Sequence, residues 1–227
     1  YVKTDKTPMG HTRLLRHPSA KDQSYFLSYL TQEQADSAVF PLAAYTKDQV
    51  RAIAAESGLP CAAKKDSQEV CFIPGKDYAS FLIHAGGLRA EPGYFLNTSG
   101  EKIGMHRGIL HYTLGQRRGL EIAMGERMYV QSLDPKNNTV TLCREDERYI
   151  TSLTVENPHW INGKPPEKPF SAQVKIRSTA RPISAEITPL SETNWQITLS
   201  QKQTFAAPGQ TAAFYDGDVL LGGARIL

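Results

Sequence analysis

Apolar residues in the first third of the chain recur at a helical spacing. Val50, Ile53 and Ala54 form an i, i+3, i+4 stripe, which predicts one apolar face of a helix. Residues 31–34 and 46–49 each place a Gln three positions after a Thr, which is the pattern of a capping box at a helix start. These signals, with the stop signals Gly58-Leu59-Pro60 and Gly86-Gly87, predict helices that begin near residues 31 and 46 and a third helix over residues 77–84.

Further along the chain the spacing changes to alternation of apolar and polar residues, which is typical of strands. Turn signals such as Thr98-Ser99-Gly100 and Asp216-Gly217 separate the alternating runs. Regular short strands broken by turns favour a small closed barrel. The predicted strands are 94–96, 102–104, 128–133, 139–143, 170–177, 183–189, 195–200, 211–215 and 219–226. The sequence therefore predicts an α+β, β-rich fold that ends in a C-terminal small β-barrel.

Two boundaries divide this pattern. The first lies near residue 75, where the helical part gives way to the first β unit. The second lies in residues 152–168, which contain Asn157-Pro158, Asn162-Gly163 and Pro165-Pro166. A chain of 227 residues exceeds the usual size of one domain. We therefore expect three parts: residues 1–75, a central β domain over 76–152, and a C-terminal barrel over 153–227.

Composition narrows the class of protein. Hydrophobic residues make up 40% of the chain, yet no apolar run approaches the roughly 18 residues that a membrane helix needs. No signal peptide is visible. Cys61, Cys71 and Cys143 are an odd number of cysteines at spacings that match no zinc motif, so we expect neither a disulfide scaffold nor a metal site. This usage fits a reducing, cytoplasmic compartment. The net charge of +3 permits RNA binding without predicting it.

Cys71 is the residue with the most informative surroundings. It follows Lys64-Lys65-Asp66-Ser67-Gln68-Glu69-Val70 and precedes Phe72-Ile73-Pro74-Gly75. Cations near a thiol lower its pKa and favour the thiolate, the form that attacks or carries sulfur. An inert, packed cysteine is the commoner class, and the window alone leaves both interpretations open.

Three long blocks, in order, resemble the family of tRNA-specific 2-thiouridylases, which place sulfur on C2 of the wobble uridine. They are residues 21–27 (Lys-Asp-Gln-Ser-Tyr-Phe-Leu), residues 66–73 (Asp-Ser-Gln-Glu-Val-Cys-Phe-Ile) and residues 112–120 (Tyr-Thr-Leu-Gly-Gln-Arg-Arg-Gly-Leu). Two further matches are residues 174–177 (Val-Lys-Ile-Arg) and 208–215 (Pro-Gly-Gln-Thr-Ala-Ala-Phe-Tyr). The resemblance spans nearly the whole chain.

The resemblance implies a nucleotide-binding domain, a central β domain and a β-barrel. The family's phosphate-cradling Ser-Gly-Gly-x-Asp-Ser turn does not occur in this chain, because Ala85-Gly86-Gly87 and Leu221-Gly222-Gly223 lack the following Asp-Ser pair. We interpret the chain as the C-terminal portion of such an enzyme, with residues 1–75 the end of an ATP-pyrophosphatase-type catalytic domain. ATP, and Mg with it, would then be bound by an N-terminal part that precedes these residues.

By the same resemblance, Cys71 is the catalytic residue that holds the transferable sulfur as a persulfide. The family's earlier cysteine, which would release the product and leave a disulfide with Cys71, has no counterpart before Cys61. Cys61 and Cys143 match no catalytic motif, and we expect both to be packed small hydrophobes. A sulfur donor or relay protein, such as a cysteine desulfurase, is the implied partner besides tRNA.

The tRNA contacts are also implied by resemblance. Lysine can neutralise a phosphate, and an amide or carboxylate can read a base edge. Ser178 departs from the family's usual tyrosine, which removes a possible stacking ring. Arg117 and Arg118 are interpreted as a solvated turn. The candidate tRNA-binding residues are Lys21, Asp22, Gln23, Arg177, Ser178 and Gln210.

Three hypotheses remain open from the sequence. The leading one is part of a tRNA 2-thiouridylase, inactive without the ATP loop and the partner cysteine. The alternative is a stand-alone tRNA-binding, sulfur-accepting module without its own adenylating activity. The third and remotest is a cysteine hydrolase, which would need a base such as His84 or His106 beside Cys71.

Overall fold

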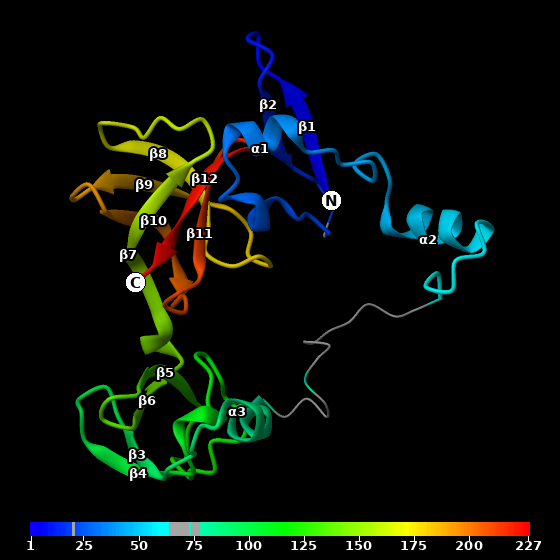
Figure 1. Ribbon diagram of the computed structural model, residues 1–227. Helices are drawn as coiled ribbons and strands as arrows, with labels where there is room; N and C mark the ends of the chain where they lie inside the picture. The colour runs from blue at the N-terminus through cyan, green and yellow to red at the C-terminus, as the bar shows by residue number, and fades with distance from the viewer. Residues whose placement is uncertain (20, 64–72, 74–77) are drawn as a thin grey trace. The chain divides into compact units, whose positions relative to one another are not determined.

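The computed structural model describes residues 1–19, 21–63, 73 and 78–227 (Figure 1). The described residues form two compact units. Unit 1 combines the chain up to residue 64 with residues 150–227, and unit 2 is formed by residues between them. Each unit has its own hydrophobic core, so each is treated separately below.

Unit 1 contains a closed six-stranded barrel, which confirms the predicted barrel (Figure 1). The strands follow the order β12-β11-β8-β9-β10-β7, and β7 pairs again with β12 to close the ring. Because the ring is closed, these strands have no exposed sheet edge among themselves. The bounds are β7 Tyr149–Trp160, β8 Phe170–Lys175, β9 Ile183–Pro189, β10 Asn194–Thr204, β11 Thr211–Asp216 and β12 Val219–Ile226.

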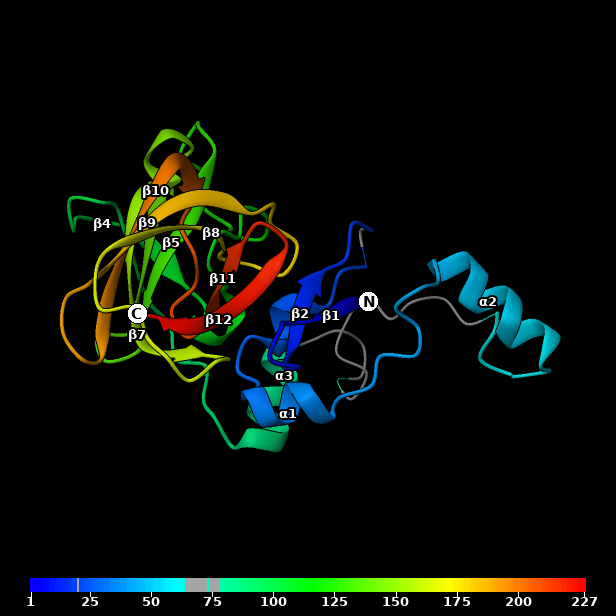
Figure 2. The ribbon, with the colours of Figure 1, turned by 90° about the horizontal axis from the view of Figure 1, so that it is seen from above.

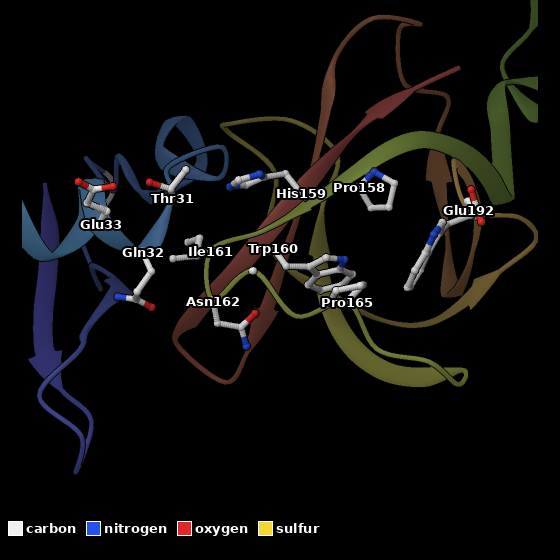
Figure 3. A pocket seen from close by; sticks show the side chains of 12 residues that line it. Thr31, Gln32, Glu33, Pro158, His159, Trp160, Ile161, Asn162, Pro165 and Glu192 are labelled. Carbon is white, nitrogen blue, oxygen red and sulfur yellow. The ribbon is translucent and has the colours of Figure 1, made fainter.

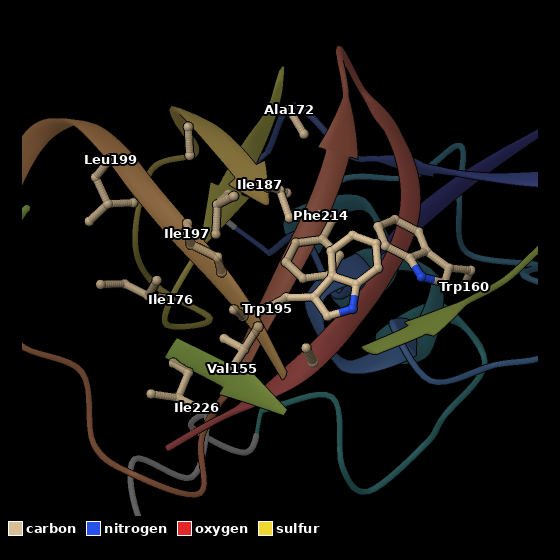
Figure 4. Packing of buried hydrophobic residues seen from close by; sticks show 14 residues of the cluster. Val155, Trp160, Ala172, Ile176, Ile187, Trp195, Ile197, Leu199, Phe214 and Ile226 are labelled. Carbon is tan, nitrogen blue, oxygen red and sulfur yellow. The ribbon is translucent and has the colours of Figure 1, made fainter. Parts of the chain in front are cut away.

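The barrel interior is filled by large apolar side chains (Figure 4). The Trp160 ring stacks on Phe214 with centroids 5.3 Å apart, and its centroid lies 5.5 Å from that of Trp195. Ile187 and Ile197, from paired strands, are fully buried beside them. The alternation seen in the sequence places these residues on one face of each strand, which is the face that lines the interior.

An N-terminal hairpin extends the same sheet. Strands β1 (Val2–Lys6) and β2 (Thr12–Arg16) pair with each other, and β2 pairs with β12 (Figure 2). A second core joins this hairpin to the barrel. It contains Val2 and Leu14 from the hairpin and Ala213, Tyr215 and Leu220 from the last two strands.

The predicted capping boxes are confirmed. Thr31 caps α1 (Gln32–Ser37) together with Gln34, and Thr46 caps α2 (Lys47–Glu56) together with Gln49. A short 3-10 helix, η1 (Ser24–Leu27), precedes them. Helix α2 has no fully buried residue, and Ile53 of its apolar stripe is exposed.

Unit 2 is a four-stranded sheet with one helix. The strand order is β4-β3-β6-β5, and only the β3–β6 pair is parallel. The bounds are α3 Tyr78–Gly86, β3 Gly93–Leu96, β4 Lys102–His106, β5 Met128–Asp134 and β6 Thr139–Arg144. Its core includes Phe95, Tyr112, Val130 and Val140, with the Phe95 and Tyr112 rings edge to face at 5.2 Å.

Three strands were not predicted from the sequence. In β1 and β2, most side chains are polar, and the hairpin is held by its pairing with β12 rather than by a visible alternation. Strand β7 runs through Asn157-Pro158, which the sequence predicted to be part of a linker. Asn157 has a φ of +48°, and the register of the β7–β12 pair shifts nearby, so the strand bends at this point instead of ending. In the part of the chain that the structure describes, no helix is long and apolar enough to cross a membrane.

Candidate functional site

The loop between β2 and η1 carries three of the sequence-predicted site residues, Lys21, Asp22 and Gln23. Asp22 fixes the shape of this loop. Its carboxylate accepts hydrogen bonds from the backbone N–H groups of His17 and Ser24, both at 3.1 Å, and from the Ser24 hydroxyl at 3.0 Å. These bonds tie Asp22 to His17 and Ser24, while Lys21 and Gln23 are exposed.

Asp22 also forms a buried ion pair with β8. Lys175 Nζ lies 3.2 Å from Asp22 Oδ2, and their side chains are only 5% and 9% exposed. Burial would raise the pKa of Asp22, but the hydrogen bonds from His17, Ser24 and Lys175 outweigh it and hold that pKa below its usual range. Asp22 is therefore ionised at neutral pH, and its carboxylate is held by these partners.

A groove of about 960 Å³ opens beside this loop. Ser178, from the connection between β8 and β9, faces the same groove, so the fold brings together four of the six tRNA-binding candidates. The lining residues are Arg16, His17, Pro18, Ser19, Lys21, Asp22, Gln23, Phe26, Lys175, Ser178, Thr179, Ala180, Arg181, Pro182 and Asp218.

The groove is basic. Its lining includes four Lys or Arg residues but only two carboxylates, Asp22 and Asp218. Arg16 pairs with Asp218, with Nη2 at 2.6 Å from Oδ1, and Lys175 pairs with Asp22. The cations of the lining, which include Lys21 and Arg181, outnumber its carboxylates, and this excess positive charge suits a phosphate backbone.

Arg177 and Gln210 lie outside this lining. Arg177 donates from Nη2 to the carbonyl oxygen of Phe205 at 2.6 Å, which directs it toward the end of β10. Gln210 is exposed on the turn before β11, where its N–H donates to Ala207 O. The structure thus places these two candidates apart from the groove residues.

The catalytic candidate, Cys71, lies outside the described residues. Cys143 is fully buried on β6, and burial raises the pKa of its thiol to about 11, so it stays protonated at neutral pH. Cys61 is exposed, which shows that the expectation of a packed Cys61 was wrong. It lies in the turn after α2, and none of the described residues 57–63 is buried.

His106, the base considered for a cysteine hydrolase, has a structural role. Its Nδ1 accepts the Gly108 N–H at 3.1 Å, and its Nε2 lies 3.1 Å from Asn138 O. Burial lowers the pKa of the ring, so the neutral form donates from Nε2. Both ring nitrogens are engaged, which leaves neither for proton abstraction. The other base considered, His84, is exposed in the last turn of α3.

A second hollow, of about 560 Å³, lies between α1 and the end of β7 (Figure 3). Its formally charged lining residues are Glu33 and Glu192. His159, also in the lining, has its Nε2 at 2.8 Å from the backbone carbonyl of Leu30. Two carboxylates repel phosphate, so this hollow is a poorer match for RNA than the basic groove.

The glycine-rich segments do not fit a nucleotide. Gly86 and Gly87 end α3, whereas a phosphate site uses the N–H groups at a helix start. Gly222 and Gly223 lie within β12 and pair with β7. In the described residues, neither segment presents the backbone donors that ATP phosphates need.

Eleven of the fifteen residues that line the groove were not among the candidates predicted from the sequence. Two of them, Phe26 and Lys175, lie in the blocks 21–27 and 174–177 that resemble the family, but neither was assigned a role. Pairing of strands far apart in the chain brings others to the groove. The eleven include Arg16, His17, Phe26, Lys175 and Arg181.

Three family models match the chain in succession. A tRNA methyl transferase HUP domain matches residues 1–75, and a tRNA methyl transferase PRC-barrel domain matches residues 80–144. An aminomethyltransferase beta-barrel domain matches residues 150–226. Together the three models span nearly the whole chain.

Curated relatives are similar along most of the chain. A protein of Acetivibrio thermocellus named tRNA-specific 2-thiouridylase MnmA is 44% identical over 91% of this chain and 57% of its own length. Proteins of the same name from Roseiflexus castenholzii and Geotalea uraniireducens are 39% and 40% identical over 99% and 100% of this chain. The chain covers 64% and 60% of those two relatives, so it spans less than two thirds of their length.

Proposed function

Because the chain belongs to the family of tRNA-specific 2-thiouridylases, we propose that it is part of an enzyme that transfers sulfur to C2 of the wobble uridine of tRNA. The observation that carries this proposal is the basic groove, in which Lys21, Gln23 and Ser178 meet. A groove with excess positive charge next to exposed polar side chains is suited to bind phosphates and to read base edges.

In this proposal, Cys71 carries the sulfur as a persulfide. Its terminal sulfur forms the bond to C2, and the activated C2 oxygen departs with its leaving group. The thiol of a second cysteine, which the family resemblance implies, would then attack Cys71 Sγ, so that the S–S bond breaks, the 2-thiouridine is released and a disulfide is left for cellular thiols to reduce. The ATP that the family resemblance implies for activating this oxygen is assigned to no described residue. A sulfur donor of the cysteine desulfurase type would reload Cys71. The reaction needs tRNA and reduced thiols, and we propose the cytoplasm as its compartment.

The groove residues have distinct roles in this proposal. Lys21 and Arg181 neutralise phosphates, and Gln23 contacts a base edge. Asp22 acts through Lys175, because their ion pair sets the position of the loop relative to β8. Arg177 and Gln210 would contact tRNA beyond the groove, from the end of β8 and from the turn before β11.

A stand-alone module that binds tRNA and accepts sulfur is the alternative. The observation that favours it is that all residues lining the basic groove belong to these 227 residues, so the groove needs no other chain to form. The two functions differ in one assay. A module of this kind would yield 2-thiouridine when a separate adenylating protein is added, whereas part of a single enzyme would need the missing residues on the same chain.

The test of Cys71 is the Cys71→Ser variant in the complete enzyme. Serine is close in size but forms no persulfide, so we expect 2-thiouridine formation to fall below detection by mass spectrometry. Binding of tRNA should remain within about twofold, because sulfur chemistry and RNA affinity use different groups.

Cys61→Ser is the matched control, because Cys61 is exposed and its loss should cost little stability. This variant should retain wild-type thiolation. If Cys71→Ser still thiolated tRNA at a rate near that of the wild type, the persulfide mechanism would be wrong.

A further inference from the structure

Phe26 places an exposed aromatic ring on the basic groove. The residue is 62% exposed, and it lines the groove together with Lys21 and Ser178. Ser178 carries no ring. Among the described lining residues, Phe26 is the one with a phenyl ring. The groove thus combines an apolar flat surface with positive charge.

The ring stands on a rigid support. Its neighbour Tyr25 is buried and donates from its hydroxyl to Thr211 O on β11 at 2.8 Å. The Ser24 hydroxyl lies 3.1 Å from the Tyr215 hydroxyl and donates to Asp22. The Phe26 ring meets Tyr25 edge to face, with centroids 5.4 Å apart and planes at 90°. The protein therefore loses little conformational entropy when a ligand covers this ring.

The combination selects one class of ligand. Cations in the groove exceed carboxylates, which favours a polyanion, and the ring favours a flat aromatic group. Single-stranded RNA offers both, because phosphates alternate with bases whose faces can stack on an aromatic side chain. A duplex keeps its base faces covered by neighbouring pairs.

We propose that Phe26 is the surface on which an unpaired base of the bound RNA stacks, while Lys21 and Arg181 hold the adjacent phosphates. This inference rests on the tRNA-binding function proposed above. It adds a contact that discriminates single-stranded from duplex RNA, and it assigns that contact to one side chain.

The test measures binding of the purified 227-residue chain to an unmodified tRNA anticodon stem–loop by fluorescence anisotropy. Phe26→Leu keeps an apolar side chain but removes the ring, and we expect affinity to fall about tenfold, as for loss of one base stack. Phe26→Trp keeps a ring and should retain wild-type affinity. Tyr45→Leu removes an aromatic ring outside the groove lining and should change nothing.

Salt dependence separates stacking from charge. Phe26→Leu should leave the slope of log affinity against log salt unchanged, whereas Arg181→Ala should lower its magnitude by about 0.7, the share of one phosphate contact on a single strand. Removing the base from each loop nucleotide in turn locates the partner. At the stacked nucleotide, removal of the base and the Phe26→Leu change should each lower the affinity about tenfold. The two changes together should lower the affinity no further than either alone.

The possible results distinguish base stacking on Phe26 from the RNA-binding function on which that inference rests. Equal affinity of wild type and Phe26→Leu for the stem–loop would overturn the stacking role and leave RNA binding standing; this is also the result expected if the ring meets a protein partner. If Phe26→Leu lost as much affinity for an RNA duplex without a loop, the stacking role would also be overturned. If the wild-type chain bound no RNA, the RNA-binding function proposed for it would be refuted together with the inference.

Discussion

The ion pair between Asp22 and Lys175 joins two segments that are far apart in the chain. Asp22 belongs to the loop with the exposed Lys21 and Gln23, and Lys175 ends β8. Removing one partner of a buried pair leaves an uncompensated charge, which costs more than the pair itself contributes. The position of the loop therefore depends on two residues that do not need to touch RNA.

We expect Asp22→Asn to destabilise unit 1 by about 3 kcal/mol, because it leaves the Lys175 ammonium buried without a counter-charge. The double variant Asp22→Asn with Lys175→Met should recover part of this loss. Urea denaturation followed by tryptophan fluorescence measures both, since Trp160 and Trp195 lie in the barrel core. Equal stability of the wild type and the single variant would show that the pair carries no such cost.

At the scale of elements, β12 depends on a glycine. Gly222 has a φ of +156°, and a Cβ at this position would collide with the carbonyl oxygen of His159 on β7. Strands β7 and β12 pair through this stretch, so the close approach is part of barrel closure. A side chain here must push the two strands apart.

Gly222→Ala should therefore lower the free energy of unfolding by about 3 kcal/mol, from backbone strain and the clash together. Gly217→Ala is the matched control. Gly217 also has a positive φ, of +56°, but a Cβ there would meet no atom within 4 Å. We expect Gly217→Ala to lower the free energy of unfolding by only about 1 kcal/mol, because the alanine must adopt a left-handed backbone conformation but meets no clash. Similar losses in the two variants would refute the close-approach argument.

The elements that the sequence predicted well are those whose stabilisation is local. The capping boxes at Thr31 and Thr46 and the alternation of β9 and β12 are legible in short windows. Strands β1, β2 and β7 were missed because distant pairing stabilises them: β2 depends on β12, and β7 bends at Asn157 instead of stopping there. Propensity within a short window cannot register a partner some 200 residues away.

In the candidate site, too, the sequence predicted the local features and missed those that depend on distant parts of the chain. The block around Lys21 and Gln23 is legible as a motif, whereas the meeting of that block with Ser178 and Arg181 follows from the β8–β9 connection. Asp22 is the clearest case. The motif does not reveal that its carboxylate pairs with Lys175, a residue 153 positions further along the chain.

At the scale of the molecule, the two units have separate cores, and both tryptophans belong to unit 1. We expect two unfolding transitions that different probes resolve. Val130→Ala, in the core of unit 2, should lower the free energy of one unfolding transition seen by circular dichroism by about 2 kcal/mol. The transition that tryptophan fluorescence reports should stay unchanged.

Ile197→Ala, in the barrel core, should do the reverse and shift the transition that tryptophan fluorescence reports. The two variants form a matched pair, since each deletes buried methyl groups from one core only. A shift of both transitions by either variant would mean that the units unfold as one cooperative body.

Strand β12 pairs with β11, β7 and β2, and it follows all other described elements along the chain. Asp218, directly before it, holds Arg16 through its side chain and also accepts the Arg16 N–H at 2.8 Å. A ribosome must therefore finish these residues before the ring can shut or the hairpin can dock. During translation, the loop with Lys21 and Gln23 emerges long before Asp218, which lines the same groove, so the complete groove can form only after Asp218 has left the ribosome.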